Sequence, residues 1–215
     1  MQPQECAHNY SDIGLAYYRL GVKMQNVKYF DTAFKYCKQS IEDKKNNPKA
    51  MVNMGLIFKQ QQNPDGALKM FKTAKDHDPL CIEAIVNIGA IEYEQFAHYE
   101  EAALLFLDAL EINPVDEEAL GNLALALKHT SYVDYAKLAF EEAVNVSPGN
   151  THILANYMYF LLEQRNFEQF SKVLPHARRV MDEKEELGPI IKIHDEFKEA
   201  IEGTAGKTIP GDELN

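Results

Sequence analysis

Residues 51–79, MVNMGLIFKQQQNPDGALKMFKTAKDHDP, contain the pattern that decides the fold. Apolar residues recur at intervals of three and four residues, first across 51–58 and again across 67–74. This spacing is typical of amphipathic helices, because the apolar residues of a half-buried strand alternate instead. Pro79 cannot continue a helix and ends the second one. We therefore predict a pair of helices joined by a turn.

The same pattern recurs with a period of about 34 residues. Pro79, Pro114 and Pro148 each end a helical pattern. Upstream of each proline come a small residue inside the first helix, a small residue inside the second, and a phenylalanine four positions later: Gly55, Ala67 and Phe71; Gly89, Ala102 and Phe106; Ala124, Ala136 and Phe140. A glycine inside a helix costs about 1 kcal/mol relative to alanine. Its presence indicates that a neighbouring helix must come close.

This spacing, met three times in succession, resembles the tetratricopeptide repeat (TPR) family. The resemblance implies an all-α fold, an α-α superhelix in the form of a right-handed solenoid, with about five helix-turn-helix units and a C-terminal capping helix. No single pair of helices buries its apolar face alone, so the units must stack. We expect the solenoid over 7–182, the capping helix over 183–202 and a flexible tail over 203–215. The expected units are 7–47, 48–81, 82–116, 117–150 and 151–182.

The two flanking units depart from the pattern. The first contains an insertion from Val22 to Tyr29, which fits either an extension of both helices or a loop. In the last unit Phe170 occupies a position where a small residue is expected, and Pro175 falls inside the second helix. We expect a kink or altered packing there.

Composition and charge argue against several classes of protein. The 215 residues are 46% hydrophobic and 26% charged, which argues against disorder. The net charge of -11 argues against nucleic-acid binding, which needs clustered Lys and Arg. No secretory signal and no apolar run that could span a membrane is visible. Three widely separated cysteines fit a reducing compartment. We expect a cytoplasmic protein, with the cilium or cytoskeleton as further possibilities.

No pattern indicates catalysis. Gly206-Lys207-Thr208 lacks the upstream glycine and the strand of a phosphate-binding loop. The seven histidines show no metal-binding spacing, and adjacent glutamates such as Glu117 and Glu118 do not share a helix face. We expect no catalytic residue, no cofactor and no metal, and therefore no enzyme.

Four asparagines occupy the same position of successive first helices: Asn53, Asn87, Asn122 and Asn156. In the resembled superhelix this position faces the concave groove. An amide both donates and accepts hydrogen bonds, so such a row can bind a peptide backbone. The predicted groove site consists of these asparagines with Lys49, Tyr93, Lys128 and Tyr159. The alternative is that the asparagines cap or bridge adjacent helices.

Further groove candidates are apolar, polar and of either charge; they are Leu15, Tyr18, Arg19, Val52, Leu56, Lys59, Gln60, Glu83, Val86, Ala90, Glu94, Glu118, Gly121, Leu125, His129, His152, Leu162 and Glu163. The resembled TPR co-chaperones hold the C-terminal carboxylate of a chaperone with Lys and Asn. Lys49, Asn53 and Asn87 match the first three clamp positions. Glu118 and Asn122 stand where Lys and Arg are required, so a carboxylate ligand would meet a carboxylate. We expect this clamp not to function.

Three functions remain open. The first is a scaffold or adaptor that binds an extended peptide or a helix of a partner protein in its groove. The second is a structural subunit of a larger complex, ciliary or cytoskeletal for example, packed through its convex face and ends. The third is the substrate-recruiting part of a larger enzyme, a role that resembled TPR modules have in glycosyl transfer and in peptidyl-prolyl isomerisation.

Overall fold

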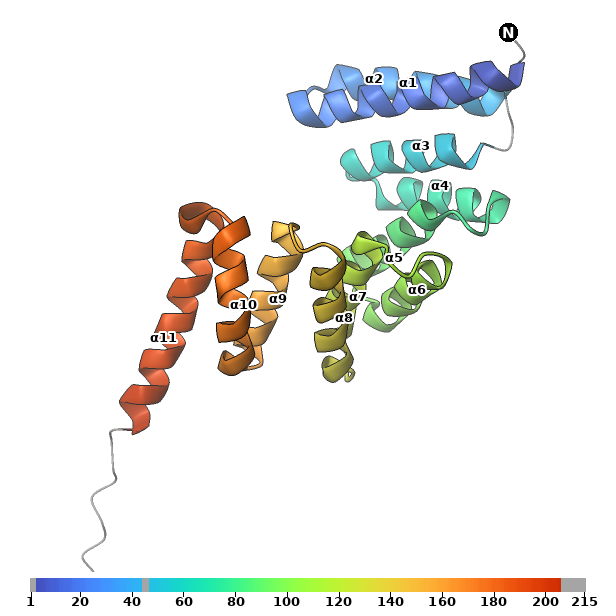
Figure 1. Cartoon of the computed structure of the whole chain (residues 1–215). Helices are drawn as coiled ribbons and strands as arrows, with labels where there is room; N and C mark the ends of the chain where they lie inside the picture. Colours follow the sequence, from blue (N-terminus) through green and yellow to red (C-terminus); the bar gives the residue numbers. More distant parts are fainter. Residues whose placement is uncertain (1–2, 44–46, 206–215) are drawn as a thin grey trace, which may run out of the picture. The chain divides into compact units, whose positions relative to one another are not determined.

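The computed structural model describes residues 3–43 and 47–205, and this part of the chain consists of helices and turns with no strand (Figure 1). The all-α prediction is confirmed. The chain divides into two compact units, Met1–Tyr132 and Val133–Asn215, each described below by itself. The sequence predicts one continuous array, whereas this division falls inside the expected repeat 117–150.

Seven helices form the described part of the first unit. They are α1 (Pro3–Met24), α2 (Val27–Asp43), α3 (Pro48–Gln60), α4 (Pro64–His77), α5 (Ile82–Phe96), α6 (Tyr99–Ile112) and α7 (Glu117–Leu127). Consecutive helices pack against one another, α1 on α2, α3 on α4 and α5 on α6. The second unit contains α8 (Val133–Val146), α9 (Thr151–Glu163), α10 (Phe167–Val180), the π-helix η1 (Glu183–Leu187) and α11 (Gly188–Ala205).

Local side chains set the helix starts. The amides of Asn47 and Asn63 accept hydrogen bonds from backbone N–H groups in the first turns of α3 and α4, and a proline follows each. Asp116 caps α7 in the same way through Ala119 N–H at 2.9 Å. Such a side chain accepts from an N–H group that has no partner within the helix, and a proline directly after the cap has no N–H that would need one.

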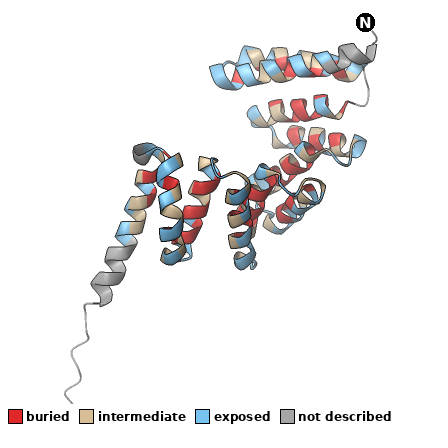
Figure 2. Cartoon of the chain, viewed as in Figure 1, coloured by how far each residue is buried: buried red, intermediate tan, exposed pale blue. Residues whose placement is uncertain are grey.

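The glycines predicted to allow close approach face the predicted phenylalanines. A Cβ atom added to Gly55 would lie 2.5 Å from the Phe71 ring, and one on Gly89 would lie 2.8 Å from Phe106. Both rings are buried, and the buried residues lie where the helices of a repeat face one another (Figure 2). The core of the first unit therefore depends on a missing side chain opposite an aromatic ring.

The insertion extends the first pair of helices. Only Gln25 and Asn26 separate α1 from α2, so the inserted residues are mostly helical. Four tyrosines stack along this longer hairpin, with ring centroids 6.0 Å apart for Tyr10 and Tyr36, 5.6 Å for Tyr36 and Tyr17, and 6.3 Å for Tyr17 and Tyr29. The residues that lengthen the helices thus also lengthen the contact between them.

The last helices of the second unit pack around Phe170. Phe170 is fully buried, and its ring stacks on His194 of α11 with centroids 4.6 Å apart. Pro175 lies inside α10, which continues as a helix to Val180. The helix α11 extends to Ala205, beyond the predicted end of the cap, because one glycine at position 203 is not enough to stop it. The remaining tail, 206–215, lies outside the described residues.

Candidate partner-binding groove

The first helices of successive repeats enclose a hollow in the first unit. This inner hollow has a volume of about 700 Å³ and receives side chains from α1, α3, α5 and α7. Its lining consists of Leu15, Arg19, Asn47, Pro48, Lys49, Val52, Asn53, Leu56, Asp78, Leu80, Cys81, Glu83, Asn87 and Glu118. Three residues of the predicted site, Lys49, Asn53 and Asn87, are therefore brought together.

Asn53 joins two helices. Its side chain is only 3% exposed, and its Nδ2 donates to the Ser11 carbonyl oxygen at 3.1 Å and to Ser11 Oγ at 3.2 Å. Ser11 lies on α1 and Asn53 on α3, so the amide bridges adjacent repeats. Asn53 thus bridges adjacent helices, which was the alternative to ligand binding, and little of its side chain is accessible to a ligand.

Asn87 and Lys49 remain accessible from the hollow. Asn87 Nδ2 donates to the Glu83 carbonyl oxygen one turn earlier, at 2.7 Å, and its side chain is half-buried. Lys49 is exposed, and its Nζ lies 2.6 Å from Asp12 Oδ1. Both residues could contact a bound segment, Asn87 through its amide oxygen and Lys49 by exchanging one carboxylate partner for another.

Carboxylates occupy the α7 side of the inner hollow. Partial burial and the neighbouring Asp116 raise the pKa of Glu118 above its ordinary value. The Lys59 ammonium acts in the opposite direction, while Glu117 and Glu83 add to the increase. This is the position at which the resembled carboxylate clamp requires a cation, so the arrangement disfavours an acidic ligand.

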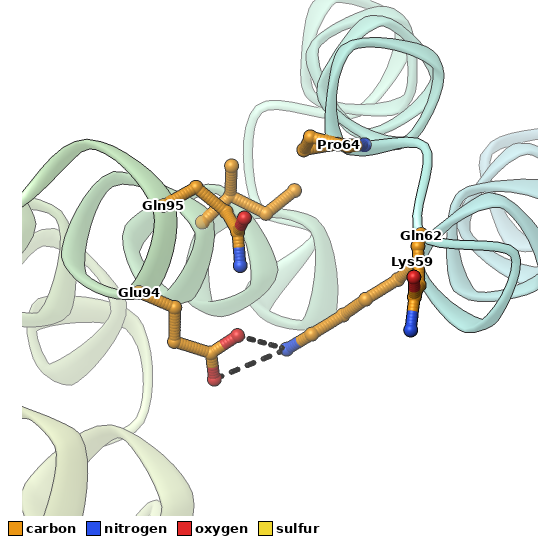
Figure 3. A pocket seen from close by; sticks show the side chains of 6 residues that line it. Lys59, Gln62, Pro64, Glu94 and Gln95 are labelled. Atoms are coloured by element: carbon orange, nitrogen blue, oxygen red, sulfur yellow. Dashed lines mark hydrogen bonds and ion pairs between the residues drawn. The ribbon is translucent and has the colours of Figure 1, made fainter.

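The first unit contains two smaller hollows as well. The outer hollow, about 250 Å³, is lined by Leu80, Ile82, Glu83, Val86, Asn113, Asp116 and Glu118. The rim hollow, about 510 Å³, is lined by Lys59, Gln62, Pro64, Ile91, Glu94 and Gln95. In the rim hollow the Lys59 ammonium reaches from α3 to both carboxylate oxygens of Glu94 on α5, at 3.2 and 3.4 Å (Figure 3).

The other predicted site residues lie elsewhere. Tyr93 belongs to an aromatic cluster with Tyr99 and His129, where the rings of Tyr99 and His129 stack with centroids 4.7 Å apart. Asn122 and Lys128 are half-buried, on α7 and immediately after it. None of Tyr93, Asn122 and Lys128 lines the inner hollow.

Asn156 and Tyr159 lie on α9 in the second unit. Asn156 is half-buried, and Tyr159 is 36% exposed. Their role in a common groove with the first unit stays a prediction.

Sequence reasoning missed the contribution of the turn after α4. Asp78, Leu80 and Cys81 line the inner hollow, and Leu80 is 68% exposed. A large apolar residue directly after the helix-ending Pro79 was the available signal, because turns are usually polar. Ser11 was missed as well, since nothing local marks it as the acceptor for Asn53.

The described residues contain neither a cluster of metal ligands nor a helix suited to span a membrane. No group of three or more His, Cys, Asp and Glu side chains there is arranged to hold a metal ion. None of the helices in that part combines the length and the apolar character that a membrane span requires.

Comparison with known proteins identifies the fold. No known protein-family model matches the chain. The protein O-mannosyl-transferase Tmtc3 of Drosophila melanogaster is 19% identical over 171 residues, which make up 80% of this chain but only 18% of that protein. The chain therefore spans less than a fifth of this relative.

Solved structures agree more closely in shape than in sequence. PilF of Pseudomonas aeruginosa superposes with a TM-score of 0.67 at 19% identity, over 81% of this chain and 79% of that one. TTC0263, a thermophilic TPR protein of Thermus thermophilus, gives 0.64 at 14%, over 85% and 97%. YrrB, a TPR protein with an unusual peptide-binding site, gives 0.57 at 18%, over 77% and 84%.

These similarities define the fold. The chain has the tetratricopeptide-repeat fold, as its small-residue spacing predicts. Repeat folds of this kind present extended surfaces on which other proteins bind.

Proposed function

We propose that this chain is a non-enzymatic scaffold whose first unit binds an extended segment of a partner protein in the inner hollow. The observation that carries the proposal is the composition of that hollow, to which four successive first helices and the turn after α4 contribute. A ligand bound there would contact several repeats at once, and an open groove suits an extended peptide.

The chemistry of the lining supports a peptide ligand. Leu15, Val52 and Leu56 supply apolar contacts, while Asn87 supplies an amide that can accept from a backbone N–H. YrrB, which shares the fold, is by its description a TPR protein with an unusual peptide-binding site. The compartment we propose is the cytoplasm, and the proposed partner is a protein rather than a nucleic acid.

A second function is favoured by the surface of α6. Leu104 and Leu107 on this helix are 63% and 46% exposed, and neither lines the inner hollow. Exposed leucines on a second helix suit a structural subunit that packs through its convex face into a larger complex.

The match to Tmtc3 favours a third function, a recruiting module attached to a transferase. In that case the chain still binds protein and the chemistry belongs to another domain. The inner hollow remains the proposed binding site.

A site-specific photocrosslinking experiment separates groove binding from convex packing. A benzophenone amino acid replaces Arg19, which lines the inner hollow, or Leu104, which is exposed on α6 outside it. Groove binding predicts crosslinks to the partner from position 19 and none from position 104. Crosslinks from position 104 alone would overturn the groove proposal and support the structural subunit.

Mutation provides a second test. The double variant Lys49→Ala with Asn87→Ala removes two polar groups from the hollow, and its matched control is Lys72→Ala with Gln39→Ala on exposed faces of α4 and α2. We expect about a tenfold loss of partner affinity in the first variant, since each tenfold corresponds to about 1.4 kcal/mol. The control should bind like the unmodified chain.

A further inference from the structure

Glu83 and Glu118 stand where two hollows meet. Both residues, together with Leu80, line the inner and the outer hollow. Glu83 lies in the first turn of α5 and Glu118 in the first turn of α7. An extended segment that ran through both hollows would pass both carboxylates.

Negative charge exceeds positive charge around this junction. Asp116 and Glu117 lie close enough to Glu118 to act on it as like charges, and Lys59 is the cation that acts in the opposite direction. The Lys59 ammonium already lies 3.2 Å from the Glu94 carboxylate. It therefore cannot fully neutralise Glu118 as well.

A second group in the same hollow responds to this charge. Burial is the main cause that raises the pKa of the Cys81 thiol, and the carboxylates of Glu83 and Asp78 raise it further. Cys81, Glu83 and Glu118 all line the inner hollow, and the Glu83 carboxylate acts on both of the others. Negative charge thus acts on more than one side chain of the hollow.

The positive charges of the inner hollow come from α1 and α3, whereas Glu83 and Glu118 lie on α5 and α7. They are Arg19 and Lys49, and the Lys49 ammonium lies 2.6 Å from Asp12. Val52 and Leu56 on α3 contribute apolar surface to the same lining. The hollow is therefore polarised, with an apolar wall and an acidic junction.

We propose, building on the proposed function, that the bound segment is a basic peptide. Its Lys or Arg side chain lies beside Glu83 and Glu118, and an apolar side chain of the same peptide contacts Val52 and Leu56. A cation at the junction forms charge-assisted hydrogen bonds with two carboxylates, which are stronger than neutral ones. Both glutamates are exposed, so this attraction is screened as salt is added.

Selection from a phage-displayed library of random dodecapeptides tests this inference. Selected peptides are synthesised, and their affinities are measured for the unmodified chain, for Glu83→Gln with Glu118→Gln, and for Glu100→Gln with Glu101→Gln. The last variant removes the same charge from the first turn of α6, where both glutamates are exposed. Circular dichroism establishes that each variant folds.

The expected peptides are enriched in Lys and Arg beside apolar residues. Their affinity should fall about tenfold or more in the Glu83 and Glu118 variant, stay unchanged in the control, and weaken as salt is added. Glu118→Lys should in turn favour peptides in which the basic residue is replaced by glutamate.

Two outcomes overturn the inference that the ligand is a basic peptide. Only the second of them also overturns the proposed function. If selected peptides lose affinity with Lys49→Ala and Asn87→Ala but not with the two glutamine substitutions, groove binding stands and the basic ligand is wrong. If no selected peptide depends on any residue of the inner hollow, the proposed function is wrong as well.

Discussion

Asn53 on α3 donates its side-chain amide to the backbone carbonyl oxygen of Ser11 on α1, over 3.1 Å in space and 42 residues in sequence. The same amide also reaches Ser11 Oγ at 3.2 Å. Both residues are buried, so this contact links the first two helical hairpins where water cannot replace it.

Asn53→Ala is therefore expected to destabilise the first unit. Loss of the amide leaves the buried Ser11 groups without this donor, which costs about 1–3 kcal/mol. Urea unfolding measures the effect. The exposed Asn145→Ala serves as the control, with an expected change within about 0.5 kcal/mol. Equal midpoints for the two variants would show that the bridge contributes little.

Gly55→Ala should also destabilise the chain, although alanine is the better helix former. The new Cβ would lie 2.5 Å from the buried Phe71 ring, and such overpacking costs about 1–3 kcal/mol. Gly149→Ala is the control, because no atom lies within 4 Å of its added Cβ. A second change, Phe71→Leu in the Gly55→Ala background, should relieve part of the clash. Thermal unfolding of the three variants decides whether the ring is the cause.

The described cysteines should differ in reactivity. Cys37 is fully buried, and burial raises its pKa to about 12. Cys81 is half-buried, and burial raises its pKa as well. Because the thiolate is the reactive form, Cys81 should react slowly with maleimide in the native protein and Cys37 only after unfolding. Mass spectrometry of a Cys6→Ser variant follows the two sites. Equal labelling in the native state would contradict the burial of Cys37.

Glu118 should make stability depend on pH in an unusual direction. Its pKa is raised in the folded chain, so folding favours the protonated form. Relative to Glu118→Gln, the unmodified chain should lose stability as the pH rises from the unfolded value of about 4.3 through the raised folded value. Denaturant unfolding at several pH values measures this difference.

Glu168 provides the opposite case. Its hydrogen bond from Lys172, at 2.6 Å, lowers its pKa. Relative to Glu168→Gln, the unmodified chain should lose stability as the pH falls through the lowered value. A difference of the same sign for both glutamates would refute the charge environment assigned to Glu118.

Much of the helical arrangement could be predicted because it rests on short-range patterns. The spacing of Gly55, Ala67 and Phe71 predicts which helix faces meet, and Pro79 predicts where a hairpin ends. Both features act within one repeat, where three or four residues make one turn of helix. The TPR fold followed from their recurrence.

The sequence by itself thus determined the helical pairs, the small residues that let them approach and the absence of any recognisable catalytic motif. Only the tertiary structure decided what the asparagines at equivalent positions of successive repeats do. The Asn53 amide donates to Ser11 on another helix, whereas the Asn87 amide donates within its own helix and its side chain lines the inner hollow. The same holds for Glu83 and Glu118, which lie on different helices yet line one junction. A repeat pattern specifies which face a residue is on, but its hydrogen-bond partner and the charges around it come from distant parts of the chain that folding brings near.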